Sequence, residues 1–220
     1  MKMIKRCGLA IGNAEKSMSR FLLMEIPDEG FSDRFADLSG VSPEELKGKT
    51  AKRQSELIAG RLLMQLGLRG EGCKSLEEIK PYPPEEVLQI IDKAITLNIL
   101  YSDKGKPSLQ NSNFKFSISH SGKYCFLAYS EEGKEIGADI ERMKPLKNLD
   151  VAKRFFHEEE YKKLVNLNYS LQIMEFYRLW TSKEAYGKCL GEGIPAIVGR
   201  KVLNADNFEY DGYSLAVYEE

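Results

Sequence analysis

Phe116-Ser117-Ile118-Ser119-His120-Ser121 begins the part of the sequence that decides the fold. Residues 114–118 and 124–130 are rich in apolar and aromatic side chains in the alternating pattern of β-strands. The polar residues 119–123 between them predict a tight turn. A third strand is expected over 136–141, so three strands follow one another closely in the second half of the chain.

Helices and a hairpin are expected after these strands. A helical region is predicted over 150–167 and a long helix over 171–190. The long helix should end at Gly191, because glycine readily adopts the left-handed conformation that closes a helix. Residues 208–213 predict a β-hairpin, and Asp211-Gly212 suits its type I′ turn.

The first half also mixes strand and helix signals. Residues 20–26 predict a strand. Ser42-Pro43 provides an N-cap and a first-turn proline for one helix up to Leu66, with Gly67 as its left-handed end. Pro83-Pro84 opens another helix, and residues 103–107 read as a turn or loop. The sequence therefore predicts an α+β fold with a boundary near residues 105 to 115, which permits two small lobes.

Composition excludes several classes of protein. The formal net charge is −1, so no overall basic field favours nucleic acid or an anionic membrane. No apolar run is long enough to cross a membrane, and the run at 9–11 is too short for an export signal. The cysteines are far apart, which indicates buried reduced thiols in a cytoplasmic protein; they are Cys7, Cys73, Cys125 and Cys189.

Two carboxylates lie within Gly137-Ala138-Asp139-Ile140-Glu141. Asp139 and Glu141 are two residues apart on a predicted strand, so both project from the same face. A divalent cation such as Mg²⁺ between them would relieve their repulsion, and this ion prefers carboxylate oxygens, water and substrate phosphates. A solvated strand face carries such pairs equally well, so this pair alone is weak evidence.

A second group of charged residues lies in the segment from Trp180 to Lys188. Glu184 and Lys188 are four apart on a predicted helix and share one face, an arrangement that a plain surface ion pair also explains. Trp180 lies one turn earlier and either walls a cleft or belongs to the core. His120 lies in the predicted turn, where hydroxyls, backbone amides and an imidazole can surround a phosphate.

Taken in order, four motifs between residues 103 and 195 resemble the phosphopantetheinyl transferases, specifically the larger type that activates surfactin synthetase. They are Gly105-Lys106-Pro107, the segment 116–121, the segment 137–141 and the segment 180–193. Their order and separation are far more specific than any one of them. A basic helical stretch, 52–61, is similar to one in enterobactin-type members.

The resemblance implies transfer of the phosphopantetheine arm of coenzyme A to a serine of an apo carrier protein, with release of adenosine 3′,5′-bisphosphate. Mg²⁺ would be the cofactor, held by Asp139, Glu141 and Glu184. The resemblance gives catalytic roles to Glu184, Lys188 and His120. It also implies coenzyme contacts at further positions, namely Arg53, Arg61, Gly105, Lys106, Pro107, Ser119, His120, Lys183 and Lys188.

The family fold is two similar α+β lobes with the coenzyme at their junction, which predicts lobes at 1–110 and 111–220. Such duplicated lobes complete a site within one chain, so a monomer is expected. The acceptor is an acyl, peptidyl or polyketide carrier protein. Two alternatives stay open, a magnesium-dependent hydrolase of nucleotide pyrophosphates and a non-catalytic carrier-binding module. The base would be Glu184 itself or a metal-bound water.

Overall fold

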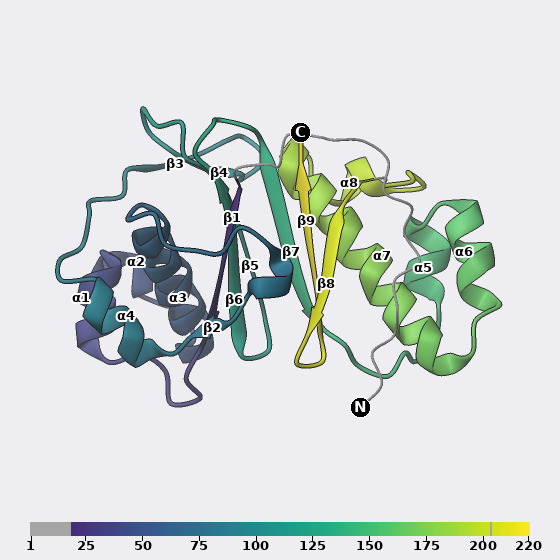
Figure 1. Cartoon of the computed structure of the whole chain (residues 1–220), viewed down its shortest axis with the longest axis horizontal. Helices are drawn as coiled ribbons and strands as arrows, with labels where there is room; N and C mark the ends of the chain where they lie inside the picture. The colour runs from purple at the N-terminus through teal and green to yellow at the C-terminus, as the bar shows by residue number, and fades with distance from the viewer. Residues whose placement is uncertain (1–18, 203) are drawn as a thin grey trace.

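The structure is a computed structural model that describes residues 19–202 and 204–220. Cys7 and the apolar run at 9–11 lie outside these residues. The fold is mixed α+β, with two larger sheets in the middle and helices on both outer sides (Figure 1). Among the described helices, none is both long and apolar enough to cross a membrane.

The first sheet has four strands in the order β2-β1-β6-β5. Their bounds are β1 Arg20–Glu25, β2 Pro81–Tyr82, β5 Lys115–Ser121 and β6 Tyr124–Ser130. β6 is antiparallel to both β1 and β5, and Ser121 pairs with Tyr124 beside a two-residue turn. Strands from both sides of residues 110 and 111 therefore share this sheet.

The other large sheet has three antiparallel strands in the order β7-β9-β8. Their bounds are β7 Ile136–Arg142, β8 Asp206–Tyr210 and β9 Tyr213–Glu219. A small separate hairpin is formed by β3 Ile99–Tyr101 and β4 Pro107–Leu109. The loop of this hairpin contains residues 103–106, as the sequence predicts.

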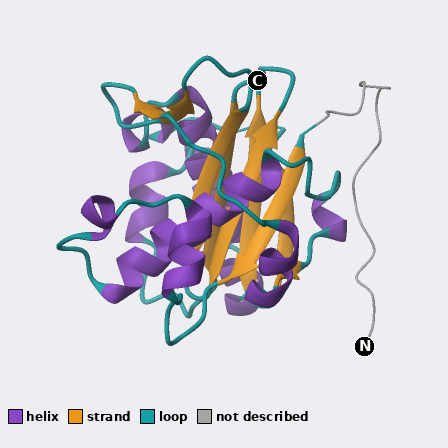
Figure 2. Cartoon of the chain, turned by 90° about the vertical axis from the view of Figure 1, so that its left-hand side faces the viewer, coloured by secondary structure: helices purple, strands orange, loops and turns teal. Residues whose placement is uncertain are grey.

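Helices cover the outer face of each sheet. Figure 2, seen from the side of the first group, shows helices lying against the strands. The first group consists of α1 Asp33–Ser39, α2 Pro43–Leu46, α3 Ala51–Gly67 and α4 Pro84–Ile90, and a short 3₁₀ turn spans Leu76–Glu78. The second group consists of α5 Asp150–Phe155, α6 Glu158–Val165, α7 Tyr169–Leu190 and α8 Ile194–Ile197.

Strand β6 joins the layers, because it packs against α3 on one face and against the second sheet on the other. All its residues are buried, because strand side chains alternate between two faces and both faces are covered. Leu127 and Tyr129 pack in the apolar cluster formed with α3. Phe126 and Ala128 pack instead against residues of β7 and β9, in the cluster between the two sheets. The result is a helix, sheet, sheet, helix arrangement with three apolar cores.

Several sequence predictions are confirmed. The strand at 20–26 is β1, and α7 ends at Gly191, whose φ of 67° is left-handed. The hairpin turn at Asp211-Gly212 has φ values of 47° and 77°, as a type I′ turn requires. Cys125 and Cys189 are buried free thiols, and Cys73 is a half-buried one.

The single helix expected from Pro43 to Leu66 is wrong. The chain breaks between α2 and α3 at Gly48, whose φ is +76°, and Thr50 starts the second helix by accepting a hydrogen bond from the Arg53 backbone N–H at 3.3 Å. Gly67 stays helical and does not adopt the expected left-handed conformation. This break starts a new helix whose first turns carry Arg53 toward β5.

The turn expected at 119–123 is also wrong, because Ser119, His120 and Ser121 belong to strand β5. Only Gly122 and Lys123 make the turn. A Cβ atom on Gly122 would lie 2.2 Å from the Tyr213 hydroxyl oxygen, so this position needs glycine. The polar side chains of β5 are therefore presented from a rigid strand.

Candidate functional site

The two carboxylates of β7 point toward the neighbouring strand β5. The Ser119 hydroxyl donates a hydrogen bond to Asp139 Oδ1 at 2.7 Å. The Ser121 hydroxyl donates to Glu141 Oε2 at 2.9 Å. Side chains two residues apart on a strand lie on the same face, as the sequence predicts for Asp139 and Glu141. The four side chains therefore meet where β5 lies against β7, a contact that we call the seam.

Gly137 brings helix α7 against this seam. A Cβ atom at Gly137 would lie 1.9 Å from the Ala185 carbonyl oxygen and 2.5 Å from the Cys189 nitrogen, so only glycine permits the helix backbone to sit there. Lys188 of α7 then places its Nζ 2.7 Å from Asp139 Oδ1. The same Nζ lies 2.9 Å from Ser119 Oγ. Gly137 of β7 therefore allows the close packing of α7 that brings Lys188 to Asp139.

Glu184 of α7 lies near enough to Asp139 and Glu141 for the charges of the three carboxylates to interact. Its side chain is half-buried, and among the described residues its carboxylate has no hydrogen-bond or ion-pair partner. Burial, and next the repulsion from Asp139, raise the pKa of Glu184. Burial and Asp139 also raise the pKa of Glu141, against the opposing effect of the Ser121 hydroxyl. The three acids therefore repel one another through a partly dry space.

The donor set fits a hard divalent cation. Asp139 Oδ2 is buried and has no hydrogen-bond partner, and a cation would satisfy it. Within the described residues, no three His, Cys, Asp or Glu side chains are already grouped as a metal site. Mg²⁺ does not require such a cage, because it usually binds one or two carboxylates together with water and substrate phosphates.

His120 projects from the other face of β5, toward α3. Its Nε2 lies 2.8 Å from Arg53 Nη1 and its Nδ1 lies 3.3 Å from Glu56 Oε1. Burial lowers the pKa of His120, and the positive charges of Arg53 and Lys188 lower it further, while Glu56 acts in the opposite direction. The lowered pKa favours the neutral ring, and an arriving phosphate would favour its protonation.

A cavity of about 330 Å³ borders His120 and collects four of the residues expected to bind the coenzyme. These four are Arg53, Arg61, Pro107 and His120. Arg61 is buried against Glu45, with Nη2 2.8 Å from Oε1, whereas Arg53 is exposed at the rim. Guanidinium groups match phosphate geometry, so this cavity is suited to an anionic nucleotide.

Lys106 and Gly105 do not line this cavity. Lys106 Nζ contacts the Cys189 carbonyl oxygen at the end of α7 and the Glu135 carboxylate. Gly105 lies in the hairpin loop with a φ of +84° and no neighbour near its missing side chain. Lys106 ties the β3–β4 hairpin to the helix that carries Glu184.

Lys183 also lies outside the carboxylate group. Its side chain is fully buried, and its Nζ lies 2.8 Å from Glu160 Oε2 and contacts the Arg200 carbonyl oxygen. Trp180 packs against Phe155 in the core of the helices. The expected phosphate contact of Lys183 and the cleft wall of Trp180 gain no support from this arrangement.

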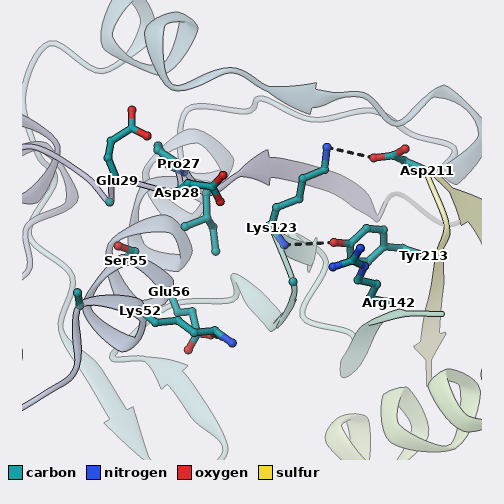
Figure 3. Close-up of a pocket in the computed structure, with 14 residues that line it drawn as sticks. Pro27, Asp28, Glu29, Lys52, Ser55, Glu56, Lys123, Arg142, Asp211 and Tyr213 are labelled. Atoms are coloured by element: carbon teal, nitrogen blue, oxygen red, sulfur yellow. Dashed lines mark hydrogen bonds and ion pairs between the residues drawn. The ribbon is translucent and has the colours of Figure 1, made fainter. Parts of the chain in front are cut away.

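A larger cavity, of about 700 Å³, lies on the other side of Glu56 (Figure 3). It is bordered by the loop after β1, the first turns of α3, the β5–β6 turn and the β8–β9 turn. Lys123 of the β5–β6 turn bridges these parts, with Nζ 3.2 Å from both Glu25 and Asp211. Its backbone N–H donates to the Tyr213 hydroxyl. Arg142, next to Glu141, also lines this space.

Sequence reasoning missed two residues of the site. Glu56 contacts both His120 and Arg53, and its position three residues after Arg53 on one helix was a usable signal. Ser121 lies in the segment 116–121, for which the resemblance implies roles only at Ser119 and His120. Its contact with Glu141 depends on how β5 and β7 lie against each other. Local sequence patterns do not show which strands are neighbours in the fold.

Comparisons with known proteins identify the family of this chain. The family model of the 4′-phosphopantetheinyl transferase superfamily matches residues 135–220, which include β7 and α7. The 4′-phosphopantetheinyl transferase psf-1 of Bacillus pumilus is 40% identical over 162 residues, which cover 70% of this chain and 68% of that protein. This chain belongs to the 4′-phosphopantetheinyl transferase family.

Two further transferases of this family match over shorter stretches. The 4′-phosphopantetheinyl transferase Sfp of Bacillus subtilis is 40% identical over 91 residues, covering 41% of this chain and 39% of Sfp. The transferase gsp of Aneurinibacillus migulanus is 37% identical over 99 residues, covering 44% of this chain and 40% of gsp. The chain thus matches about two fifths of the length of these two relatives.

Proposed function

We propose that the chain transfers the 4′-phosphopantetheine arm of coenzyme A to a serine of an apo carrier protein and releases adenosine 3′,5′-bisphosphate. The observation that carries the proposal is the convergence of three acids and Lys188 beside a cavity lined by arginines and His120. The relatives are named 4′-phosphopantetheinyl transferases, which supports the same reaction. The carrier belongs to fatty-acid, polyketide or peptide synthesis in this proposal, and the chain acts as a monomer.

The reaction needs a base and charge neutralisation. A new bond forms between the serine oxygen and the phosphorus next to pantetheine, and the bond from this phosphorus to the bridging oxygen of the pyrophosphate breaks. The serine proton must leave, and we assign it to Glu184. Its carboxylate is free to accept a proton, because it has no hydrogen-bond or ion-pair partner among the described residues.

Asp139, Glu141 and Glu184 would hold Mg²⁺, which when bound neutralises charge on the pyrophosphate and on the leaving bisphosphate. Glu184 would both help to hold the ion and accept the serine proton. Lys188 already lies against Asp139, and its ammonium would stabilise the departing phosphate. These residues come from β7 and α7, two rigid elements that Gly137 holds in contact.

The nucleotide end of coenzyme A would occupy the smaller cavity, where Arg53, Arg61 and His120 meet its phosphates. Lys188 contacts both Ser119 and Asp139, so the pyrophosphate would lie between this cavity and the carboxylates, beside Lys188. We place the carrier protein on the side of the larger cavity, whose lining includes Arg142 next to Glu141. Figure 3 shows this cavity. In this arrangement the coenzyme lies at the junction of two lobes, and the division at 110 and 111 stays a prediction.

Release of adenosine 3′,5′-bisphosphate distinguishes the proposal from its alternatives. The chain is incubated with coenzyme A and Mg²⁺, with and without an apo carrier, and the bisphosphate is measured by chromatography. We expect release only when the carrier is present. Rapid release without a carrier would favour a hydrolase, and no release with any of several carriers would favour a binding module.

The stabilising effect of Mg²⁺ should depend on pH. The pKa values of Glu141 and Glu184 are raised in the folded chain. Their contribution to the stability of the fold is therefore complete at low pH, where both are protonated, and is lost as pH rises through the raised pKa values. Mg²⁺ competes with protons for the ionised groups. We therefore expect the shift in Tm on adding Mg²⁺ to be small near pH ~5 and to grow toward pH ~8.

Differential scanning fluorimetry of the full chain measures this shift. The variant Asp139→Asn provides the control, because it removes one charge from the group and should show little response to Mg²⁺ at either pH. A wild-type shift that stays constant or decreases as pH rises would contradict the assignment of these acids.

A further inference from the structure

The seam between β5 and β7 is unusual because the two strands lie side by side but belong to different sheets (Figure 1). β7 pairs with β9 and β5 pairs with β6. An unpaired strand edge exposes backbone groups that need hydrogen-bond partners. Along this seam, side-chain hydroxyls of β5 supply those partners.

Alternate serines of β5 reach across the seam. Ser117 Oγ accepts a hydrogen bond from the Ala138 backbone N–H at 2.9 Å. Ser121 Oγ accepts one from the Arg142 backbone N–H at 3.0 Å. The two serines thus fix the edge of β7 in the same way, at points four residues apart on each strand.

Unlike Ser117, Ser121 also donates a hydrogen bond to a carboxylate. With the Arg142 N–H bound to its oxygen, the Ser121 hydroxyl donates its one proton to Glu141 Oε2 at 2.9 Å. A hydroxyl held on both sides has no freedom to rotate. One oxygen of Glu141 is therefore fixed, which leaves the other to face a ligand.

We propose that Ser121 is a positioning residue that orients the Glu141 carboxylate for the divalent cation. This inference rests on the proposed function. Hydrogen-bond partners of metal-binding carboxylates fix their orientation, and loss of such a partner typically weakens metal affinity or activity about 10–100-fold. Ser121 does not touch the cation or the coenzyme in this account, and it acts only through Glu141.

The test compares Ser121→Ala, Ser121→Thr and Ser117→Ala in the full chain. Mn²⁺ serves as the probe, because it takes the same oxygen ligands as Mg²⁺. Free Mn²⁺ is measured by electron paramagnetic resonance with coenzyme A present and no carrier. We expect Ser121→Ala to raise the Kd for Mn²⁺ about 10–100-fold. Ser121→Thr keeps the hydroxyl and should recover most of the affinity.

Ser117→Ala is the matched control, because it removes a seam hydroxyl that contacts no carboxylate. It should lower stability but leave the Kd for Mn²⁺ within about twofold of wild type, below the effect expected for a lost metal-ligand partner. Transfer assays give a second readout. The loss in Ser121→Ala should be recovered by high Mg²⁺, as a raised KM for the metal, whereas mere structural damage would lower the rate at every concentration.

Three results would overturn the inference. If wild type binds Mn²⁺ and modifies carriers, but Ser121→Ala binds Mn²⁺ as tightly as wild type, the positioning role is wrong and the proposed function stands. A loss as large in Ser117→Ala as in Ser121→Ala would overturn it in the same way. If wild type neither binds Mn²⁺ nor modifies any carrier, the proposed function fails and this inference fails with it.

Discussion

Replacing Glu184 by glutamine should slow transfer about 10²–10⁴-fold, the usual contribution of a general base. The substitution keeps the shape of the side chain and removes its charge. Glu184 is the acid in the cluster that has no hydrogen-bond or ion-pair partner among the described residues, while Asp139 is bound by Lys188 and Glu141 by Ser121. The measurement is single-turnover transfer to an apo carrier, with the chain saturated with coenzyme A.

Glu175→Gln on the same helix provides the control for Glu184→Gln. Glu175 pairs with Arg178 on the exposed side of α7, with distances of 2.6 and 2.7 Å. A surface pair of this kind contributes only about 0.3–0.5 kcal/mol, so Glu175→Gln should transfer at the wild-type rate. Near-normal transfer by Glu184→Gln would remove this residue from the roles of base and essential ligand.

Replacing Lys183 by methionine should destabilise the fold by about 3–5 kcal/mol, because it leaves the buried Glu160 carboxylate without its partner. Glu160 also accepts the His157 backbone N–H at 3.0 Å as part of the cap that starts α6. The Lys183–Glu160 pair therefore joins the start of α6 to α7, one residue before Glu184. Urea unfolding followed by circular dichroism gives the loss of stability.

The double variant Lys183→Met, Glu160→Met tests the same pair by removing both of its charges. Replacing a whole buried ion pair with apolar residues is often neutral or stabilising, so the double variant should be more stable than Lys183→Met. The expected phosphate contact makes a different prediction: stability would hold and the KM for coenzyme A would rise. That result would support a contact between Lys183 and the coenzyme.

Local sequence patterns predicted the secondary structure around the site well, because it depends on neighbours along the chain. The alternation in 137–141 placed Asp139 and Glu141 on one face of β7, and the spacing of Glu184 and Lys188 placed them on one face of α7. Gly191 ended the helix as expected, since its left-handed conformation is a local property.

The errors arose where tertiary contacts decide. Ser119, His120 and Ser121 resemble a polar turn, but β7, α7 and α3 provide partners for their side chains, so the strand continues. The resemblance placed Lys106 at the adenine nucleotide and Lys183 beside the coenzyme. In the structure each lysine has a partner distant in sequence, Glu160 for Lys183 and the end of α7 for Lys106. Their coenzyme contacts stay predictions.

The mass of an apo carrier protein after incubation with this chain tests the central claim most directly. A panel of acyl, peptidyl and polyketide carriers is treated with coenzyme A and Mg²⁺, using wild type and Asp139→Asn in parallel, and each carrier is examined by intact-mass spectrometry. We predict that wild type adds one phosphopantetheine group to the serine of at least one carrier and that Asp139→Asn adds almost none. Equal modification by both, or no modification of any carrier by wild type, would contradict the account.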